Sequence, residues 1–357
     1  MTYAVKENET AARERLQAFW AGTAIDRPAL HVVVKNPEFV EQPWPGKVDE
    51  SLPLAQRELT AEKHAWDIRH GSRRWLYLAE SMPGHHVPWG SFLTTLAVLA
   101  GGEYEYHESA WIKEIPDILN RPPPRFDPAH PVARRLDACY AAAKEAIGTD
   151  GFITPPLMMD GLTTLAMFRG ADRLCMDLVD RPDWAKAWTG ALNTMYIDIY
   201  ERYYRSLGYG ESICFFGPMA EGRSEGVQCD FAVNLSPAMY EEFVLPDMLR
   251  VTNYMDRSLY HLDGTCQMRF IDLLRQCPKL SGIQWNPEST AGSPLKWIDA
   301  LREIRRRRFC LMIWAPSVEE AVELAKALGP EGLYLIPPAS ETVAEAEETI
   351  RRIQAVC

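Results

Sequence analysis

Two consecutive strand–helix units in residues 258–288 constrain the fold of this chain more than any other stretch. The first reads Ser-Leu-Tyr-His-Leu-Asp-Gly and is followed by a helical spacer; the second reads Ser-Gly-Ile-Gln-Trp-Asn-Pro-Glu. Successive side chains of a strand point to opposite faces, so His261 and Asp263 lie on one side and Leu262 on the other. The first unit therefore presents two titratable groups together where its strand ends.

The second unit repeats this arrangement. Asn286 and Glu288 follow the apolar Ile283 and Trp285 at the end of the next strand. Consecutive strand–helix units that carry titratable groups at the carboxyl ends of their strands are typical of the active site of a (β/α) barrel. We therefore expect the two strands to be adjacent and parallel, and the protein to be an enzyme.

The rest of the C-terminal half continues the alternation of apolar strands and amphipathic helices, which indicates a parallel sheet covered by helices. Further strands are predicted at 309–314 and 333–336, and helices at 236–257, from 265, from 293, from 317 to Gly329, and from 340. Upstream, strands are predicted at 30–34, 152–157, 212–216 and 227–232, and long helices at 131–147 and 182–206.

These elements predict an α/β fold, a (β/α)8 TIM barrel in a single domain over residues 1–357. Residues 1–120 are expected to include an N-terminal helical elaboration, because the stretch 38–120 is rich in Pro and Trp and does not follow the simple strand–helix pattern. This elaboration would cover one end of the barrel. A chain of this length can bury one large core.

Charge and composition exclude several classes of function. The formal net charge of −11 argues against a surface for nucleic acid or for an anionic membrane, since both need clustered cations. The one basic run, 305–308, is interpreted as the end of a helix, where the dipole favours cations, rather than as a phosphate site. A small molecule remains the expected substrate.

The location predicted from the sequence is the cytoplasm. The N-terminus is polar and has no apolar core of a signal peptide, and the longest apolar stretch, 92–100, is too short to span a bilayer. The eight cysteines are scattered without a Cys-x-x-Cys pair, which indicates a reducing compartment.

With these motifs in place, the chain resembles the uroporphyrinogen decarboxylase superfamily, and especially its methyltransferase-like branches, over nearly its whole length. The matching segments are 15–20 through 25–28, 160–180, Cys229-Asp-Phe231, 236–246, Tyr260-His-Leu-Asp-Gly264 and Ile283-Gln-Trp285. The resemblance implies a (β/α)8 barrel with its site at the carboxyl ends of the strands.

Two departures set this chain apart from the true decarboxylases. These resemble one another in an arginine-rich segment after the first strand, where this chain has Val-Val-Lys-Asn-Pro at 33–37, and in a histidine after the last strand, where it has Ile-Pro-Pro-Ala-Ser at 336–340. A tetrapyrrole with eight carboxylates needs a strongly cationic pocket. We therefore expect that Lys35 alone does not support binding or decarboxylation of uroporphyrinogen.

The methyltransferases of this superfamily transfer methyl groups from a corrinoid protein or a small donor to a thiol. They resemble one another in a zinc-binding His-x-Cys motif and a later Cys, which correspond here to His261, Asp263 and Cys310. Nitrogen, oxygen and sulfur ligands are all acceptable to Zn²⁺. A carboxylate in place of a thiolate leaves a more Lewis-acidic metal, suited to binding a thiolate, an alkoxide or water.

Each candidate site residue also has a structural interpretation. In this interpretation, Asp263 does not hold a metal but orients His261 or caps the following helix. Cys310, in the same interpretation, only packs in the core. Glu288 is a general acid or base, a substrate anchor or a solvated loop carboxylate. Asp160, at the end of a strand-like segment, is expected at the barrel mouth, whereas Asp230 is interpreted as a buried carboxylate bonded to backbone.

The predicted function is that of a methyltransferase that uses His261 and Asp263, with Cys310 and a zinc ion, to activate a small acceptor. One alternative is a decarboxylase for a small carboxylated substrate or a porphyrinogen, with Asp263 or Asp160 handling protons. Another is a non-catalytic corrinoid-binding partner. A corrinoid protein is an expected partner in the first case, and assembly as a homodimer is left open.

Overall fold

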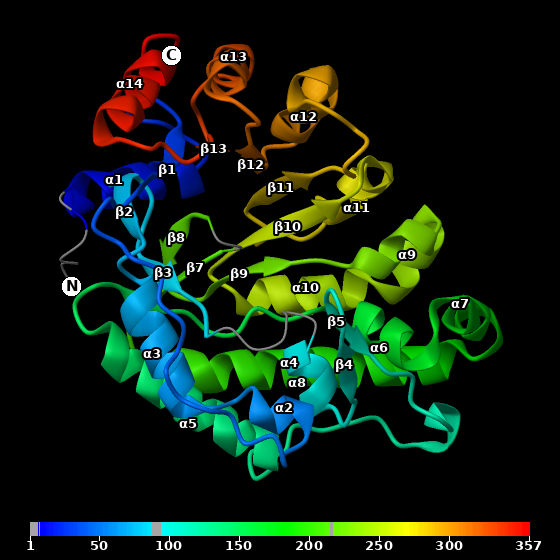
Figure 1. The fold of residues 1–357 in the computed structure, drawn as a ribbon. Coiled ribbons are helices and arrows are strands. Elements are labelled where there is room, and N and C mark those ends of the chain that lie inside the picture. Colours follow the sequence, from blue (N-terminus) through cyan, green and yellow to red (C-terminus); the bar gives the residue numbers. More distant parts are fainter. Residues whose placement is uncertain (1–5, 7, 88–93, 215–216) are drawn as a thin grey trace.

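The computed structural model describes residues 6, 8–87, 94–214 and 217–357. Its centre is a seven-stranded sheet in the order β2-β1-β13-β12-β11-β10-β9, seen across the upper half of Figure 1. The strands are β2 (Trp75–Ala79), β1 (Ala29–Lys35), β13 (Leu333–Ile336), β12 (Cys310–Trp314), β11 (Gly282–Asn286), β10 (Arg257–Asp263) and β9 (Ser224–Val227). All neighbours in this order are parallel except β1 and β2, which are antiparallel.

The expected pairing of the two strand–helix units is confirmed. Strands β10 and β11 are adjacent and parallel, with His261 level with Gln284 and Asp263 level with Asn286. The protein is therefore a mixed α/β fold with a mostly parallel sheet. Within the described residues, backbone hydrogen bonds do not close this sheet into a ring, since β2 and β9 form its edges.

Three short strand pairs lie outside the main sheet. Strands β3 (Gly84–His85) and β6 (Phe152–Ile153) are parallel, whereas β4 (Tyr104–Tyr106) with β5 (Ala110–Ile112), and β7 (Glu211–Ile213) with β8 (Met219–Glu221), are antiparallel. The strand predicted at 152–157 is therefore shorter than expected, and that predicted at 212–216 is described as β7, with residues 215–216 outside the described part of the chain. Neither β6 nor β7 joins the central sheet.

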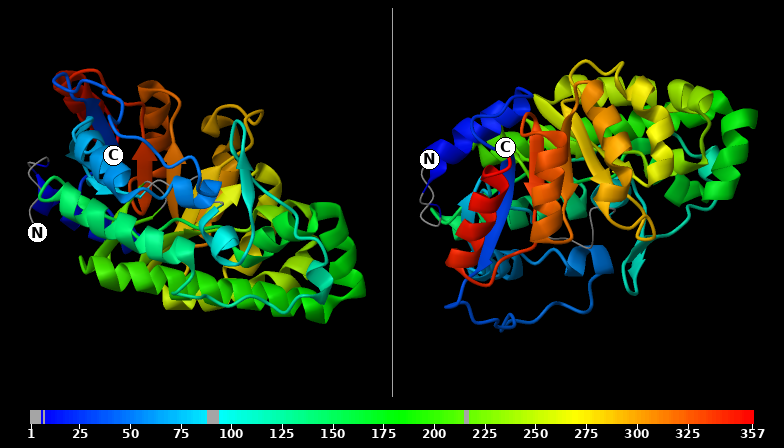
Figure 2. Two further views of the ribbon diagram at one scale, coloured as in Figure 1. Left: turned by 60° about the horizontal axis from the view of Figure 1, so that its bottom comes forward. Right: turned by 90° about the horizontal axis from the view of Figure 1, so that it is seen from above.

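Helices pack beside the strands of the sheet and form a further group on the other side of the molecule. The α-helices are α1 (Glu9–Trp20), α2 (Leu54–Arg57), α3 (Ala61–Gly71), α4 (Thr94–Leu99), α5 (Pro131–Ile147), α6 (Gly161–Arg169), α7 (Ala171–Asp180), α8 (Pro182–Leu207), α9 (Pro237–Phe243), α10 (Leu245–Tyr254), α11 (Ile271–Leu274), α12 (Ile298–Arg306), α13 (Val318–Leu328) and α14 (Val343–Gln354). Figure 1 shows α12, α13 and α14 beside the C-terminal strands, and Figure 2 shows the long α5 and α8 along the other side of the molecule. Among the described residues, no helix combines the length and apolar character needed to cross a bilayer.

Local chemistry sets many of these boundaries. Helix α5 begins with Pro131, whose missing N–H costs nothing in a first turn, and α13 begins after Ser317, whose hydroxyl accepts the Glu320 N–H. The single helix predicted at 236–257 is instead two, α9 and α10, which meet at Val244. Pro246 explains the break, since it lacks the N–H that a continuous helix would need there.

The N-terminal elaboration is not purely helical, contrary to the prediction. It contains α2, α3 and α4, but its residues 75–79 form β2, which pairs with β1 over five residues as the antiparallel edge of the central sheet. Alternating Trp75, Tyr77 and Ala79 are compatible with a strand, but the aromatic and Pro-rich surroundings concealed that pattern.

The register arranges inward-pointing side chains of the sheet in levels. Gly282 is level with Leu259 of β10 and with Cys310 of β12, and one level further along lie His261, Gln284 and Met312. A Cβ atom on Gly282 would lie 2.4 Å from the Cys310 carbonyl oxygen. Only glycine allows these neighbouring strands to approach so closely.

Replacing Gly282 by alanine is expected to lower the free energy of unfolding by about 1–3 kcal/mol, because the added methyl group must push strand backbone apart. Urea denaturation measures the change. Gly190→Ala is the control: it lies within α8 with nothing within 4 Å of its Cβ position, and alanine there should leave stability unchanged or raise it. Equal effects of the two substitutions would contradict this account of the strand contact.

Candidate functional site

Asp230, His261 and Asp263 form a cluster that could hold a metal ion. One ligand atom from each lies within 4.8 Å of the other two, and all three residues are half-buried. His261 and Asp263 lie at the carboxyl end of β10, while Asp230 begins the 3₁₀ turn η2 (Asp230–Asn234), three residues beyond the end of β9. The carboxyl ends of two neighbouring strands thus bring the cluster together.

The imidazole of His261 is held in one orientation by side chains of β11. Its Nδ1 lies 2.6 Å from Gln284 Oε1, which accepts hydrogen bonds only, so Nδ1 carries the proton. Its Nε2 lies 3.3 Å from the Asn286 amide nitrogen and 3.9 Å from Asp263 Oδ1. Nε2 therefore keeps its lone pair, which accepts the Asn286 amide N–H beside Asp263.

The protonation of His261 agrees with this tautomer. Burial lowers the pKa of His261 below its ordinary value, against the opposing effects of the Gln284 hydrogen bond and the Asp263 charge. The neutral imidazole is the form that binds metals. Asn286 also donates to Asp263 Oδ1 at 2.9 Å, and so links both members of the β10 pair.

The carboxylates around His261 lack a basic counterion. Burial raises the pKa of Asp230 to about 8, and the charges of Asp160 and Asp263 add to this effect; burial also raises the pKa of Asp160 to about 6. Within the described parts of the chain, no Arg or Lys nitrogen forms an ion pair with these three carboxylates. Such crowding of acids favours either shared protons or a bound cation.

Asp160 has a structural role that accounts for most of its contacts. Its Oδ1 accepts the backbone N–H groups of Leu162 and Thr163, both at 3.0 Å, and so caps α6. The residue is nonetheless near enough to Asp230 to raise that residue's pKa. The structure thus puts Asp160 behind the cluster rather than among its ligand atoms.

Glu288 holds the loop that follows Asp263. Its two oxygens accept the backbone N–H and the hydroxyl of Thr265, each at 2.8 Å, and these bonds lower the pKa of the Glu288 carboxyl. The side chain belongs to the next strand–loop unit, so it joins the two loops at the carboxyl ends of β10 and β11. These contacts favour a positioning role for Glu288, which is not among the roles predicted from the sequence.

Glu288→Gln is therefore expected to leave metal affinity nearly unchanged and to cost about 1 kcal/mol of stability, the usual effect of losing a cap. Calorimetric titration with Zn²⁺ and urea denaturation measure the two quantities. A loss of metal affinity as large as that of His261→Ala would instead show that Glu288 is a ligand.

Cys310 is not brought to the cluster, which corrects the predicted ligand set. It is the first residue of β12, level with Leu259, and therefore lies two strands away from β10 and one level closer to the amino ends than His261. Its thiol donates to the Phe19 carbonyl oxygen of α1 at 3.1 Å, and burial raises its pKa to about 11. Cys310 thus lies toward the opposite end of the sheet.

The sequence interpretation assigned no site role to Asp230 or Gln284, whereas it named Asn286 among the polar residues at the end of its strand. Asp230 was assigned to backbone bonding because a strand was predicted over 227–232, whereas β9 ends at Val227 and leaves Asp230 beyond the carboxyl end. Gln284 and Asn286 alternate with Trp285 on β11, and this alternation alone predicts that they share the side of His261.

Trp314 and Trp285 lie on neighbouring strands, and of the two only Trp314 is open to solvent. Trp314, at the carboxyl end of β12, is 40% exposed and follows the inward-pointing Met312 by two residues. Trp285 is buried and packs against Trp297 of η4 (Pro294–Trp297), with 6.0 Å between ring centroids. Trp314 therefore offers an apolar surface at the same end of the sheet as the cluster.

The comparisons with known proteins inform the fold. No family model matches the chain, and no curated protein matches it either. Among solved structures, a methyltransferase from Methanosarcina mazei superposes with a TM-score of 0.57, at 14% identity, over 97% of this chain and 98% of that one. This chain thus shares its overall fold with that enzyme from end to end.

Proposed function

We propose that this protein is a methyltransferase-type enzyme that binds Zn²⁺ through Asp230, His261 and Asp263 and moves a methyl group from a corrinoid or small donor to a small acceptor. The observation that carries the proposal is the convergence of three ligand atoms within 4.8 Å at the carboxyl ends of β9 and β10. Sites at this edge of a parallel sheet are where such folds place their chemistry.

The donor set fits the ion. One imidazole nitrogen and two carboxylate oxygens are an accepted set for a catalytic zinc site, which keeps a further position open. Gln284 supplies the outer hydrogen bond that fixes the ligating tautomer of His261. The ligand atoms need to approach one another slightly, and Asn286 would give up its contact with Nε2 when a metal binds there.

A zinc ion at this position would lower the pKa of an acceptor thiol and so supply the nucleophile for methyl transfer. The chain's own side chains have separate tasks. Gln284 and Asn286 orient His261 and Asp263, Asp160 caps α6 behind the cluster, and Trp314 gives the methyl donor or the acceptor an apolar wall. Asp230 releases its proton when a cation binds.

We further infer that the sheet is part of a (β/α)8 barrel of the uroporphyrinogen decarboxylase-like type, in a single domain, with a corrinoid protein as partner. The end-to-end likeness to a methyltransferase fold and the parallel order from β9 to β1 support this inference. The motif resemblance of residues 260–264 and 283–285 supports it independently of the fold.

A decarboxylase is the second candidate, and one observation favours it. Asp230, with a pKa of about 8, is a carboxylic acid at neutral pH and could protonate the carbanion left after loss of CO₂. Asp263 or Asp160 would then handle further protons without a metal. The substrate would be a small carboxylated molecule rather than a tetrapyrrole with eight carboxylates. Lys35, the one cation at the end of β1, is exposed and lies 4.0 Å from Glu341, so it does not form a cationic pocket.

Metal analysis of protein purified without chelator tests the proposal. We expect about one zinc ion per chain in the wild type and in the control Cys310→Ala, and a loss of metal in His261→Ala. Methyl transfer from free methylcobalamin to a small thiol should follow the metal content. A wild type without metal affinity removes the zinc mechanism, and tight binding of a corrinoid protein without any turnover favours the non-catalytic partner.

A further inference from the structure

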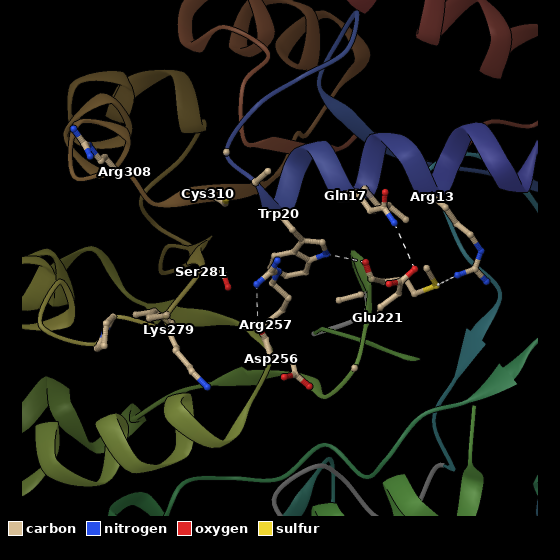
Figure 3. A pocket seen from close by; sticks show the side chains of 18 of the residues that line it. Arg13, Gln17, Trp20, Glu221, Asp256, Arg257, Lys279, Ser281, Arg308 and Cys310 are labelled. Atoms are coloured by element: carbon tan, nitrogen blue, oxygen red, sulfur yellow. Dashed lines mark hydrogen bonds between the residues drawn. The ribbon is translucent and has the colours of Figure 1, made fainter. Parts of the chain in front are cut away.

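A large cavity lies at the opposite end of the sheet from the cluster. It has a volume of about 800 Å³ and is lined by the end of α1, by β8 and by residues at the amino ends of β10, β11 and β12. Figure 3 shows the side chains around it, with Trp20 near the middle and Arg257 and Lys279 on the side of β10. Its size is that of a small-molecule site.

Four cations around this cavity have no acidic partner. Among the described residues, no carboxylate oxygen lies within 4.0 Å of a side-chain nitrogen of Arg257, Arg275, Lys279 or Arg308, all of which line the cavity. In a chain with a net charge of −11, unpaired cations gathered around one cavity create a local positive field.

The acidic residues of the lining do not neutralise these cations. Asp256 accepts the Arg223 backbone N–H at 2.9 Å, and Glu221 accepts from Gln17 at 3.4 Å. A fifth lining cation, Arg13, is itself paired with Glu211 at 2.7 Å. The lining as a whole carries five cations against two carboxylates, Asp256 and Glu221.

Side-chain contacts hold Arg275 and Lys279 in position, whereas Arg308 is constrained through its backbone. Arg308 has φ 63°, a left-handed conformation that a non-glycine residue adopts only at a cost of about 1 kcal/mol. The Arg275 guanidinium lies over the Phe309 ring, 5.8 Å from its centroid, and Lys279 Nζ donates to the Asn253 carbonyl oxygen at 3.0 Å. These side chains are therefore partly organised before any ligand arrives.

The end of α1 does not repel an anion as strongly as a bare helix C-terminus. The Phe19 carbonyl oxygen accepts both the Gly22 N–H and the Cys310 thiol, which satisfies it. Trp20 turns its N–H away to the Met219 carbonyl oxygen at 2.8 Å, so its ring adds an apolar wall.

We propose that this cavity binds a small molecule with two or more negative charges, carried by phosphate or carboxylate groups, with any apolar part against Trp20. Guanidinium groups recognise both kinds of anion through paired hydrogen bonds. The site is separate from the Asp230–His261–Asp263 cluster and does not depend on the function proposed for it.

Calorimetric titration of the full chain with pyrophosphate and, in a second arm, with citrate tests the proposal at low ionic strength. We expect measurable binding of at least one anion, weakened about tenfold or more in Arg257→Gln, the usual effect of losing one charged hydrogen-bonding partner. The control is Arg134→Gln, which removes the same charge at an exposed position of α5, away from the cavity. The anion with the higher affinity shows whether the natural ligand carries phosphate or carboxylate groups.

Arg308→Gly provides a variant that should keep the fold, because glycine accepts a positive φ without strain. It should unfold at the same or higher urea concentration than the wild type and yet bind the anion about tenfold more weakly. Absence of binding to both anions overturns the proposal, and so does equal weakening in Arg257→Gln, Arg308→Gly and Arg134→Gln, which would indicate a general charge effect.

Discussion

Asp230→Asn is expected to weaken Zn²⁺ binding about a hundredfold and to make that binding less dependent on pH. Loss of one of three protein ligands removes a large share of the binding free energy of a zinc site. In the wild type, a cation must displace the proton that the raised pKa of about 8 keeps on Asp230. Below pH 8, wild-type affinity should therefore rise with pH up to about tenfold per unit from this group alone.

The same substitution should stabilise the metal-free protein. The folded-state pKa of Asp230, about 8, lies above the ordinary value of 3.8, so the folded state binds the extra proton and wild-type stability falls as the pH rises from about 4 to 8. Asparagine has no such proton to lose. We expect a gain of about 2 kcal/mol near pH 8 by urea denaturation without metal.

Asp247→Asn is the matched control for the zinc measurement. Asp247 is a half-buried carboxylate of α10 that pairs with Arg250 at 3.0 Å and is not a member of the cluster. Asp247→Asn should change neither the Zn²⁺ affinity nor the dependence of that affinity on pH. Unchanged zinc affinity in Asp230→Asn would remove Asp230 from the ligand set and leave the decarboxylase candidate stronger.

The largest loss of stability is expected from Glu80→Gln. Glu80 is 0% exposed and binds the guanidinium of Arg27 through both oxygens, at 2.6 and 2.9 Å, while one of these oxygens also accepts the Leu30 N–H. Removing its charge leaves Arg27, itself only 5% exposed, as a buried cation without a full counterion. Breaking such a pair costs about 3–5 kcal/mol.

Thermal and urea unfolding measure this loss, and a surface pair provides the comparison. Glu242→Gln removes the partner of Lys186, 2.6 Å away in a pair that is about half exposed, and should cost less than about 1 kcal/mol. Equal losses of unfolding free energy in the two variants would contradict the conclusion that the buried Arg27–Glu80 pair anchors the start of β1 to the end of β2.

The C-terminal half of the fold could be predicted from the sequence because its signals are local and agree with one another. Ser317 and Gly329 mark helix ends, and β10 and β13 alternate with amphipathic helices at regular intervals. The role of residues 75–79 was not predictable in this way. Their partner, β1, lies about forty residues upstream across an irregular stretch, and pairing over such a distance leaves no local pattern.

The candidate site could be inferred from the sequence where strand alternation decides it, but not where strand length decides it. His261 and Asp263 follow from the period of two in β10. Cys310 was assigned to the same site although it begins its strand instead of ending it, and a shift of two residues along a strand moves a side chain by about 7 Å. Asp230 was overlooked for the converse reason, since β9 ends earlier than its sequence suggests.

The pairing of β1 with β13 has a consequence for synthesis of the protein on the ribosome. Ala29 pairs with Tyr334, so one edge of the first long strand stays unpaired until its partner is translated some 300 residues later. At bacterial or eukaryotic elongation rates this interval lasts about 15–60 seconds. Throughout it, the apolar Leu30, Val32 and Val34 have only β2 beside them, and the open edge of β1 is available to chaperones or to other nascent chains.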